Sequence, residues 1–112
     1  MTQDIADLTA SIQAFARERD WEQFNTPKNL ACALTVESGE LLEHFQWLTI
    51  EQSSALMADP AKRAEVADEL ADVLIYCLSF ANCAGIEVGQ AIQAKLARNE
   101  VRFPVAEVRG RY

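Results

Sequence analysis

Apolar residues recur at intervals of three and four along the whole chain, which is the spacing of one face of an α-helix. No stretch alternates apolar and polar residues between turn residues in the manner of a β-strand. The pattern therefore predicts an all-α fold. Four main helices are expected, at about residues 3–20, 27–48, 60–84 and 87–103, with a short helix or turn at 50–58.

Capping residues and prolines predict where several of these helices begin. Thr2 is the predicted cap of the first helix. Thr26 precedes Pro27, and Asp59 precedes Pro60. A capping side chain followed by a proline at the first helical position is typical of a helix start, so both main central helices have defined N-termini.

The second half of the chain carries the matching stop signals. Gly85 can adopt the left-handed backbone conformation that ends a helix, and Pro104 cannot continue the last helix. Residues 105–112 are then expected to form a short basic tail. With 112 residues the chain has the length of one domain, so residues 1–112 are interpreted as a single unit.

One helix is too apolar for a lone bundle. Residues 73–84 are apolar nearly all round, whereas a helix in an isolated four-helix bundle leaves one side to water. A second copy of the chain would cover the excess. We therefore expect a four-helix-bundle protomer that assembles into a homodimer or a dimer of dimers, which is a homotetramer.

Charge and composition exclude several classes of protein. Ten basic residues stand against 17 acidic ones, and this net charge of -7 argues against binding of a nucleic acid polymer. The acidic N-terminus is unlike a signal peptide, and the apolar stretch at 73–86 is too short and polar for a membrane span. A cytoplasmic location without a membrane partner is expected. The three cysteines form no CxxC pair, which indicates neither a disulfide framework nor a zinc site.

Two pairs of acids interrupt the apolar stripes. Position 37 continues the stripe of the second helix, yet it holds a glutamate, and Glu40 follows one turn later. Glu69 and Asp72 repeat this spacing directly before the apolar run of the longest helix. Four carboxylates brought together in a partly desolvated bundle require protons or a multivalent cation.

Oxygen ligands favour a hard cation, so Mg²⁺ is the expected metal and Mn²⁺ a possible substitute. The rival interpretation is that all four acids lie on solvated faces beside basic partners. A di-iron carboxylate site needs a Glu-x-x-His motif on each of two helices, and the chain has one histidine, His44, at the wrong spacing.

Cationic and aromatic side chains offer complementary chemistry. Lys95, Asn99 and Arg102 share one face of the last helix, which suits a chain of phosphates or, equally, a solvated surface with acidic neighbours. Trp47 lies seven residues after Glu40, where its ring could stack on a base or simply join the core.

Three segments together resemble a known family. They are ERDWEQFNTPKNLACALTVESGELLEHFQW at 18–47, DELADVLIYCLSFANCAGI at 68–86 and K-x-x-x-N-x-x-R-F-P at 95–104. This set resembles the MazG-like all-α nucleoside triphosphate pyrophosphohydrolases, and within them the dCTP pyrophosphatase branch. The resemblance covers most of the chain and rests on E-x-x-E and E-x-x-D within their W-E-Q-F, F-Q-W and D-V-L-I-Y contexts.

The resemblance implies a helical homo-oligomer that hydrolyses a (deoxy)nucleoside triphosphate, dCTP-like or another pyrimidine nucleotide, to the monophosphate and pyrophosphate. The four acids would be the catalytic residues and Mg²⁺ ligands, and one of them, Glu40, would accept a proton from water. Ile12 stands where some relatives carry a histidine near the base, which leaves base selectivity open. The substrate-binding residues implied by the match are Trp21, Trp47, Tyr76, Lys95 and Asn99, to which the helical face adds Arg102.

A different class of function also fits part of the pattern. In this alternative the chain is a non-catalytic helical dimerisation or interaction module, its acids are solvated, and no metal is needed. The two hypotheses differ in whether a divalent cation and a nucleotide stabilise the protein.

Overall fold

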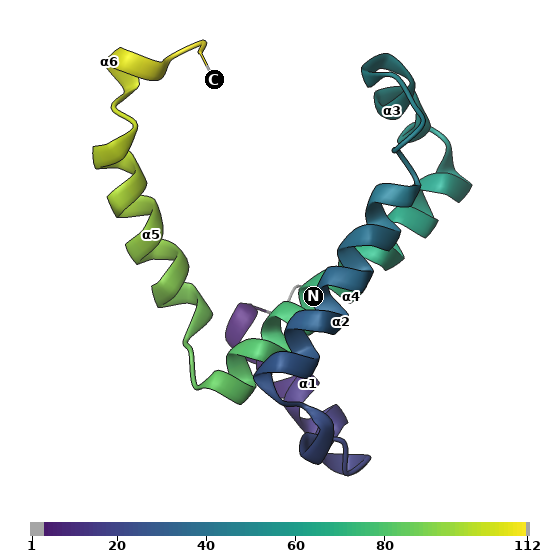
Figure 1. The fold of residues 1–112 in the computed structure, drawn as a ribbon, viewed down its shortest axis with the longest axis vertical. Coiled ribbons are helices and arrows are strands. Elements are labelled where there is room, and N and C mark those ends of the chain that lie inside the picture. Colours follow the sequence, from purple (N-terminus) through teal and green to yellow (C-terminus); the bar gives the residue numbers. More distant parts are fainter. Residues whose placement is uncertain (1–3, 112) are drawn as a thin grey trace.

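The computed structural model describes residues 4–111, and within them it contains helices and turns but no strand, as the sequence predicts. Figure 1 shows the arrangement. In chain order the elements are α1 (Ile5–Glu18), the 3-10 helix η1 (Glu22–Phe24), α2 (Pro27–Glu43), α3 (Ile50–Leu56), α4 (Pro60–Ala84), α5 (Val88–Arg102) and α6 (Val105–Val108).

Helix starts are fixed by side chains that accept hydrogen bonds from free backbone N–H groups. The hydroxyl of Thr26 accepts from Asn29 N at 3.3 Å, and the Asp59 carboxylate accepts from Ala61 N at 3.0 Å, which confirms both predicted starts. The cap of α1 was predicted wrongly, because Asp4 caps this helix. The predicted cap, Thr2, lies outside the described residues.

Two predicted boundaries need correction. Helix α2 ends at Glu43 instead of Leu48, and residues 44–48 form turns. A new helix starts soon afterwards, because Thr49 is extended as the N-cap of α3 and exchanges hydrogen bonds with Gln52 in a capping box. The expected basic tail also contains one short helix, α6.

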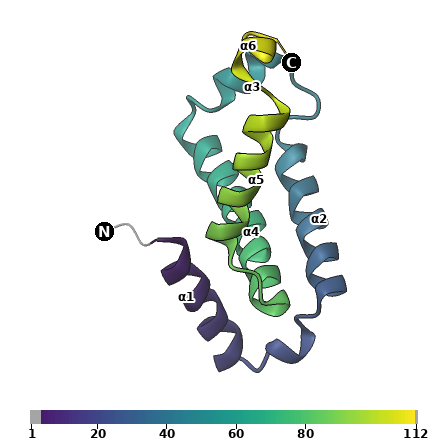
Figure 2. The ribbon, with the colours of Figure 1, turned by 90° about the vertical axis from the view of Figure 1, so that its left-hand side faces the viewer.

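The pairing of α2 with α4 forms the main body of the protomer. The two helices lie side by side along the acidic segment, and α1 packs against the C-terminal half of α4 (Figures 1 and 2). The buried core among the described residues is small and consists of Ala16, Leu30 and Ala81, one from each of these helices. The three helices thus enclose few side chains completely.

Helix α5 leaves this body. It is bent by 101° from α4 at the break that contains Gly85, so the two arms of the protomer diverge (Figure 1). The expected four-helix bundle is therefore not closed within one chain. In the described part of the chain no helix alone has the length and apolarity to cross a membrane; the bent α4–α5 pair meets those two criteria only when taken together.

The protomer exposes far more surface than its size requires. Its accessible area is 8893 Å², whereas a compact monomer of 12.5 kDa exposes about 6,200 Å². Its radius of gyration is 17.1 Å, against about 13 Å for a compact chain of this length. Much of the excess is apolar, and it includes Leu74 on α4 and Leu96 on α5, both about half exposed.

Gly85 should be required for the bend between the arms. Its φ of 68° lies in the left-handed region, so Gly85→Ala should lower the free energy of unfolding by about 1 kcal/mol. Gly39 lies inside α2 with open space around its Cα, so Gly39→Ala should raise the free energy of unfolding by about 0.5–1 kcal/mol. Urea denaturation of both variants checks the opposite signs, and equal effects would contradict the account.

Candidate metal centre

Three carboxylates meet in the seam between α2 and α4. Glu37 and Glu40 lie one turn apart on α2, and Glu69 lies opposite them on α4. One oxygen of each lies within 4.8 Å of the others, and all three residues are half-buried. The two helices that hold the protomer together therefore also bring these acids together.

The carboxyl group of Glu40 lies close enough to those of Glu37 and Glu69 for a proton to be shared with either. The bond to Glu40, burial and the neighbouring negative charges raise the pKa of Glu37 from 4.5 to about 7. Burial first, then the bond to Glu40, raises the pKa of Glu69 above 4.5, although His44 opposes this shift. Like charges at this separation favour a bound proton or an added cation.

The site fits a hard divalent cation. Oε2 of Glu37 and Oε2 of Glu69 are buried, and neither has a hydrogen-bond partner among the described residues. A buried carboxylate oxygen without a partner raises the free energy of the folded state, and a bound cation would compensate the charge of these two atoms. A carboxylate-only donor set is the chemistry that Mg²⁺, Mn²⁺ and Ca²⁺ prefer.

Asp72 and His44 lie at the edge of the cluster. Asp72 is exposed and outside the set of three, but its charge still raises the pKa of both Glu37 and Glu69. His44, at the C-terminal cap of α2, is half-buried beside the acids. The sequence signal for His44 was its spacing of four from Glu40, which places it on the same helical face.

The predicted base and sugar residues are distributed over the protomer. Trp21 is the N-cap of η1, before the start of α2, and makes an edge-to-face contact with Phe15, with ring centroids 5.8 Å apart. Trp47 follows the other end of α2 and is 87% exposed. Tyr76 is half-buried on α4, one turn beyond Asp72. Within one chain, the two tryptophans lie beyond opposite ends of α2.

The predicted phosphate-binding residues lie on the other arm. Lys95, Asn99 and Arg102 belong to α5, which diverges from the seam of α2 and α4 (Figure 1). Lys95 lies beside an apolar hollow of α5, and the guanidinium of Arg102 lies 5.1 Å from the ring centroid of Phe103. A single protomer therefore separates its cationic face from its acidic cluster.

Comparison with known proteins identifies the family. Residues 32–111 match the MazG-like family, and the chain belongs to that family. This confirms the resemblance that the three sequence segments indicate.

Named relatives and a solved structure agree with this assignment. The chain is 43% identical over 106 residues to dCTP pyrophosphatase 1 of Bos taurus, covering 95% of this chain and 63% of that protein. It is 42% identical over 100 residues to dCTP pyrophosphatase 1 of Homo sapiens, covering 89% and 59%. The chain thus spans about three fifths of the length of these curated relatives.

The crystal structure of a pyrophosphatase from Archaeoglobus fulgidus DSM 4304 aligns with a TM-score of 0.84. It is 33% identical in sequence, and the alignment covers 93% of this chain and 95% of that chain. The arrangement of helices described above is therefore shared along nearly the whole length of both chains.

The effect of a divalent cation on stability should depend on pH. Glu37 and Glu69 have raised pKa values, so their contribution to stability is present below pH 4.5 and is lost as the pH rises, for Glu37 through about 7. Mg²⁺ should replace the lost protons. Thermal melts at about pH 5 and about pH 7.5, with EDTA or MgCl₂, should give the larger Mg²⁺-induced rise in Tm at the higher pH.

A matched pair of variants isolates the cluster. Glu69→Gln should abolish most of the Mg²⁺-induced rise, whereas Glu65→Gln, one turn earlier on α4 and exposed, should keep it. Equal Mg²⁺ effects at both pH values, or in both variants, would contradict binding at the three carboxylates.

Proposed function

We propose that the chain is a metal-dependent nucleoside triphosphate pyrophosphohydrolase, which releases a nucleoside monophosphate and pyrophosphate. The observation that carries this proposal is the half-buried cluster of Glu37, Glu40 and Glu69, with two unpartnered oxygens. The relatives named dCTP pyrophosphatase 1 support a dCTP-like pyrimidine deoxynucleotide as the substrate. In this role the protein would limit surplus or non-standard nucleotides.

The three clustered glutamates would hold Mg²⁺, with Mn²⁺ as a substitute, and Asp72 would complete the set of acids from the exposed edge. Bound there, the cation would supply charge neutralisation for the triphosphate and polarise its α-phosphoryl group. Glu40 is the proposed proton acceptor, because its carboxyl group interacts with those of both other glutamates. Water oxygen then bonds to the α-phosphorus, and the bond to the bridging oxygen breaks as pyrophosphate leaves.

A second copy of the chain is proposed to complete the site. The cationic face of α5 cannot reach the acids of its own protomer, because the two arms diverge. Residues 95–112 carry five basic and two acidic side chains, whereas residues 1–94 carry five basic and 15 acidic ones. The basic arm of one copy therefore attracts the acidic arm of another. The excess area of about 2,700 Å² per chain, or about 5,400 Å² for two chains, is at the upper end of the range that obligate dimers bury in total.

In such an assembly Lys95, Asn99 and Arg102 of one copy would contact the phosphates held at the acids of the other. Trp21, Trp47 and Tyr76 are the proposed contacts of base and sugar. The four-helix bundle would then be formed by α2 and α4 together with helices of the partner, as a homodimer or a homotetramer. Within each copy, residues 1–112 act as one MazG-like domain.

Glu69→Gln should separate catalysis from folding. The amide removes one anionic ligand while keeping the shape, so turnover of dCTP should fall at least about a hundredfold, with unchanged helicity by circular dichroism. The assay resolves pyrophosphate from orthophosphate, with MgCl₂ and with EDTA. Glu65→Gln is the control and should keep full activity. Absence of hydrolysis across all nucleoside triphosphates would favour the interaction module, whereas hydrolysis that persists in EDTA would contradict the proposed role of the metal.

Mixing two inactive variants tests the shared site. Lys95→Ala should lose phosphate contacts and Glu69→Gln should lose the metal, so each variant alone should have low hydrolytic activity. After denaturation and refolding together, heterodimers contain one site with an intact acid set and an intact α5, which should restore up to about a quarter of wild-type activity. Failure of the mixture to exceed the sum of the separate variants would place Lys95 in the same chain's site or outside it.

A further inference from the structure

The connection between α1 and α2, residues 19–26, carries Trp21 and is held by hydrogen bonds instead of by burial. None of its residues is buried, and only Asn25 is half-buried. It contains the W-E-Q-F segment at 21–24, whose glutamine holds neither metal nor phosphate in the proposed mechanism. Whatever fixes this connection also fixes Trp21, which is a proposed contact of base and sugar.

Asp20 turns the chain at the end of α1. Its φ of 54° lies in the left-handed region, and among residues 4–111 it is the one residue other than glycine with a positive φ. The backbone N–H of Asp20 donates to Arg17 O at 3.1 Å, and that of Trp21 donates to Ala16 O at 2.9 Å. These two bonds form a Schellman motif, which usually has glycine at the left-handed position. Because Ala16 is buried, the motif ties the backbone of Trp21 directly to the core.

Gln23 holds this turn from the side of η1. Its Nε2 donates to the backbone oxygen of Asp20 at 3.0 Å and to Oδ2 of the same residue at 3.1 Å. Both partners can only accept, so the orientation of the amide is determined. The left-handed conformation is unfavourable for a residue with a Cβ atom, and these two bonds stabilise it. At the other end of η1, Nδ2 of Asn29 donates to the Phe24 backbone oxygen at 3.0 Å.

The ring of Trp21 is oriented by Phe15. The two rings meet edge to face, with an interplanar angle of 70°. Arg19 covers Phe15, with its Cζ 3.6 Å from the ring centroid, and its Nη1 donates to the Phe15 backbone oxygen at 3.0 Å. Trp21 remains 49% exposed, so a large part of the indole is free to contact a ligand.

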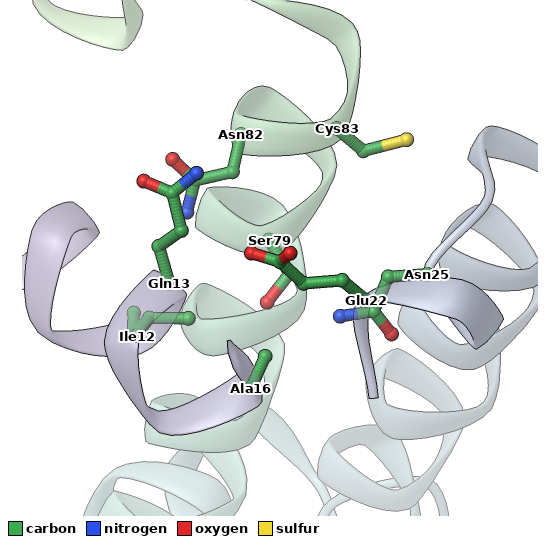
Figure 3. A pocket seen from close by; sticks show the side chains of 8 residues that line it. All are labelled: Ile12, Gln13, Ala16, Glu22, Asn25, Ser79, Asn82 and Cys83. Carbon is green, nitrogen blue, oxygen red and sulfur yellow. The ribbon is translucent and has the colours of Figure 1, made fainter. Parts of the chain in front are cut away.

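The connection also forms one wall of a polar cavity of about 310 Å³. Figure 3 shows the lining: Glu22 and Asn25 come from the connection, whereas Gln13, Ser79 and Asn82 come from α1 and α4. A shift of η1 against α1 would therefore move this wall together with the indole. The position of the connection thus matters beyond the tryptophan itself.

We propose that Asp20 and Gln23 are positioning residues for Trp21. The amide of Gln23 holds the left-handed turn at Asp20, and this turn directs the indole so that its exposed part meets the nucleotide. Neither side chain needs to touch the substrate. The assignment rests on the proposed hydrolysis of nucleoside triphosphates, in which Trp21 contacts base and sugar.

A double-mutant cycle tests whether Gln23 acts through Trp21. Gln23→Met keeps the length of the side chain but loses both hydrogen bonds, so it should raise the KM of dCTP about threefold to tenfold while kcat stays within about twofold. In Trp21→Ala, where the indole is gone, the same substitution should change KM by less than about twofold. Gln93→Met, at an exposed position of α5, is the matched control and should leave both constants unchanged.

Substitutions at Asp20 test the turn. Asp20→Ala loses the carboxylate and disfavours the left-handed conformation, so it should raise KM as Gln23→Met does. Asp20→Gly adopts the turn without strain and keeps the backbone oxygen that Gln23 contacts, so its KM should stay within about twofold of the wild-type value. An equal rise of KM in the alanine and glycine variants would overturn the role of the turn.

Fluorescence measures the position of the indole without catalysis. In a Trp47→Phe background Trp21 is the only tryptophan, and Gln23→Met should shift its emission to longer wavelength and increase its quenching by acrylamide. Unchanged emission, an equal rise of KM with and without Trp21, or a fall in kcat alone would overturn the assignment and leave the hydrolase proposal intact. A wild-type protein that releases no pyrophosphate from any nucleoside triphosphate would overturn the hydrolase proposal instead, and a shifted emission would still show that Gln23 positions Trp21.

Discussion

Three carboxylates of like charge lie in the seam between α2 and α4, and the rest of the structure depends on what neutralises them. This seam is the main helix contact of the protomer, so repulsion between Glu37, Glu40 and Glu69 acts directly on the packing that holds the fold. A proton shared through Glu40 is one solution, and a divalent cation is the other. With a cation, an acidic protein can also attract a triphosphate, because the local charge is inverted.

The open shape follows from the small core. Few side chains are buried, and large apolar residues on α4 and α5 face outward, so one chain cannot cover its own apolar surface. The same bend that exposes this surface carries the cations of α5 away from the acids. Assembly and completion of the site are thus linked, because any partner that fills the space between the arms also brings its own α5.

Local signals in the sequence were sufficient for most helices and for the acids on α2. Glu37 was found because it occupies a position in an apolar stripe, and it is half-buried as that position requires. The predicted end of α2 is wrong, because Phe45 and Leu48 continue the apolar spacing of the helix although they lie in the turns before the N-cap Thr49. The direction of α5 could not be predicted, since an apolar face does not specify which neighbour covers it.

Ser79 and Asn82 illustrate why the polar residues of a cavity are harder to predict from the sequence than a cluster of acids. Both interrupt the apolar run of α4, yet a serine or an asparagine in a helix has many uses, whereas paired acids in a stripe have few. Their meaning comes from α1, where Thr9 fixes Asn82 and Gln13 faces the same cavity. Because α1 contributes none of the clustered acids, its polar contact with α4 can change while the carboxylates between α2 and α4 stay in place.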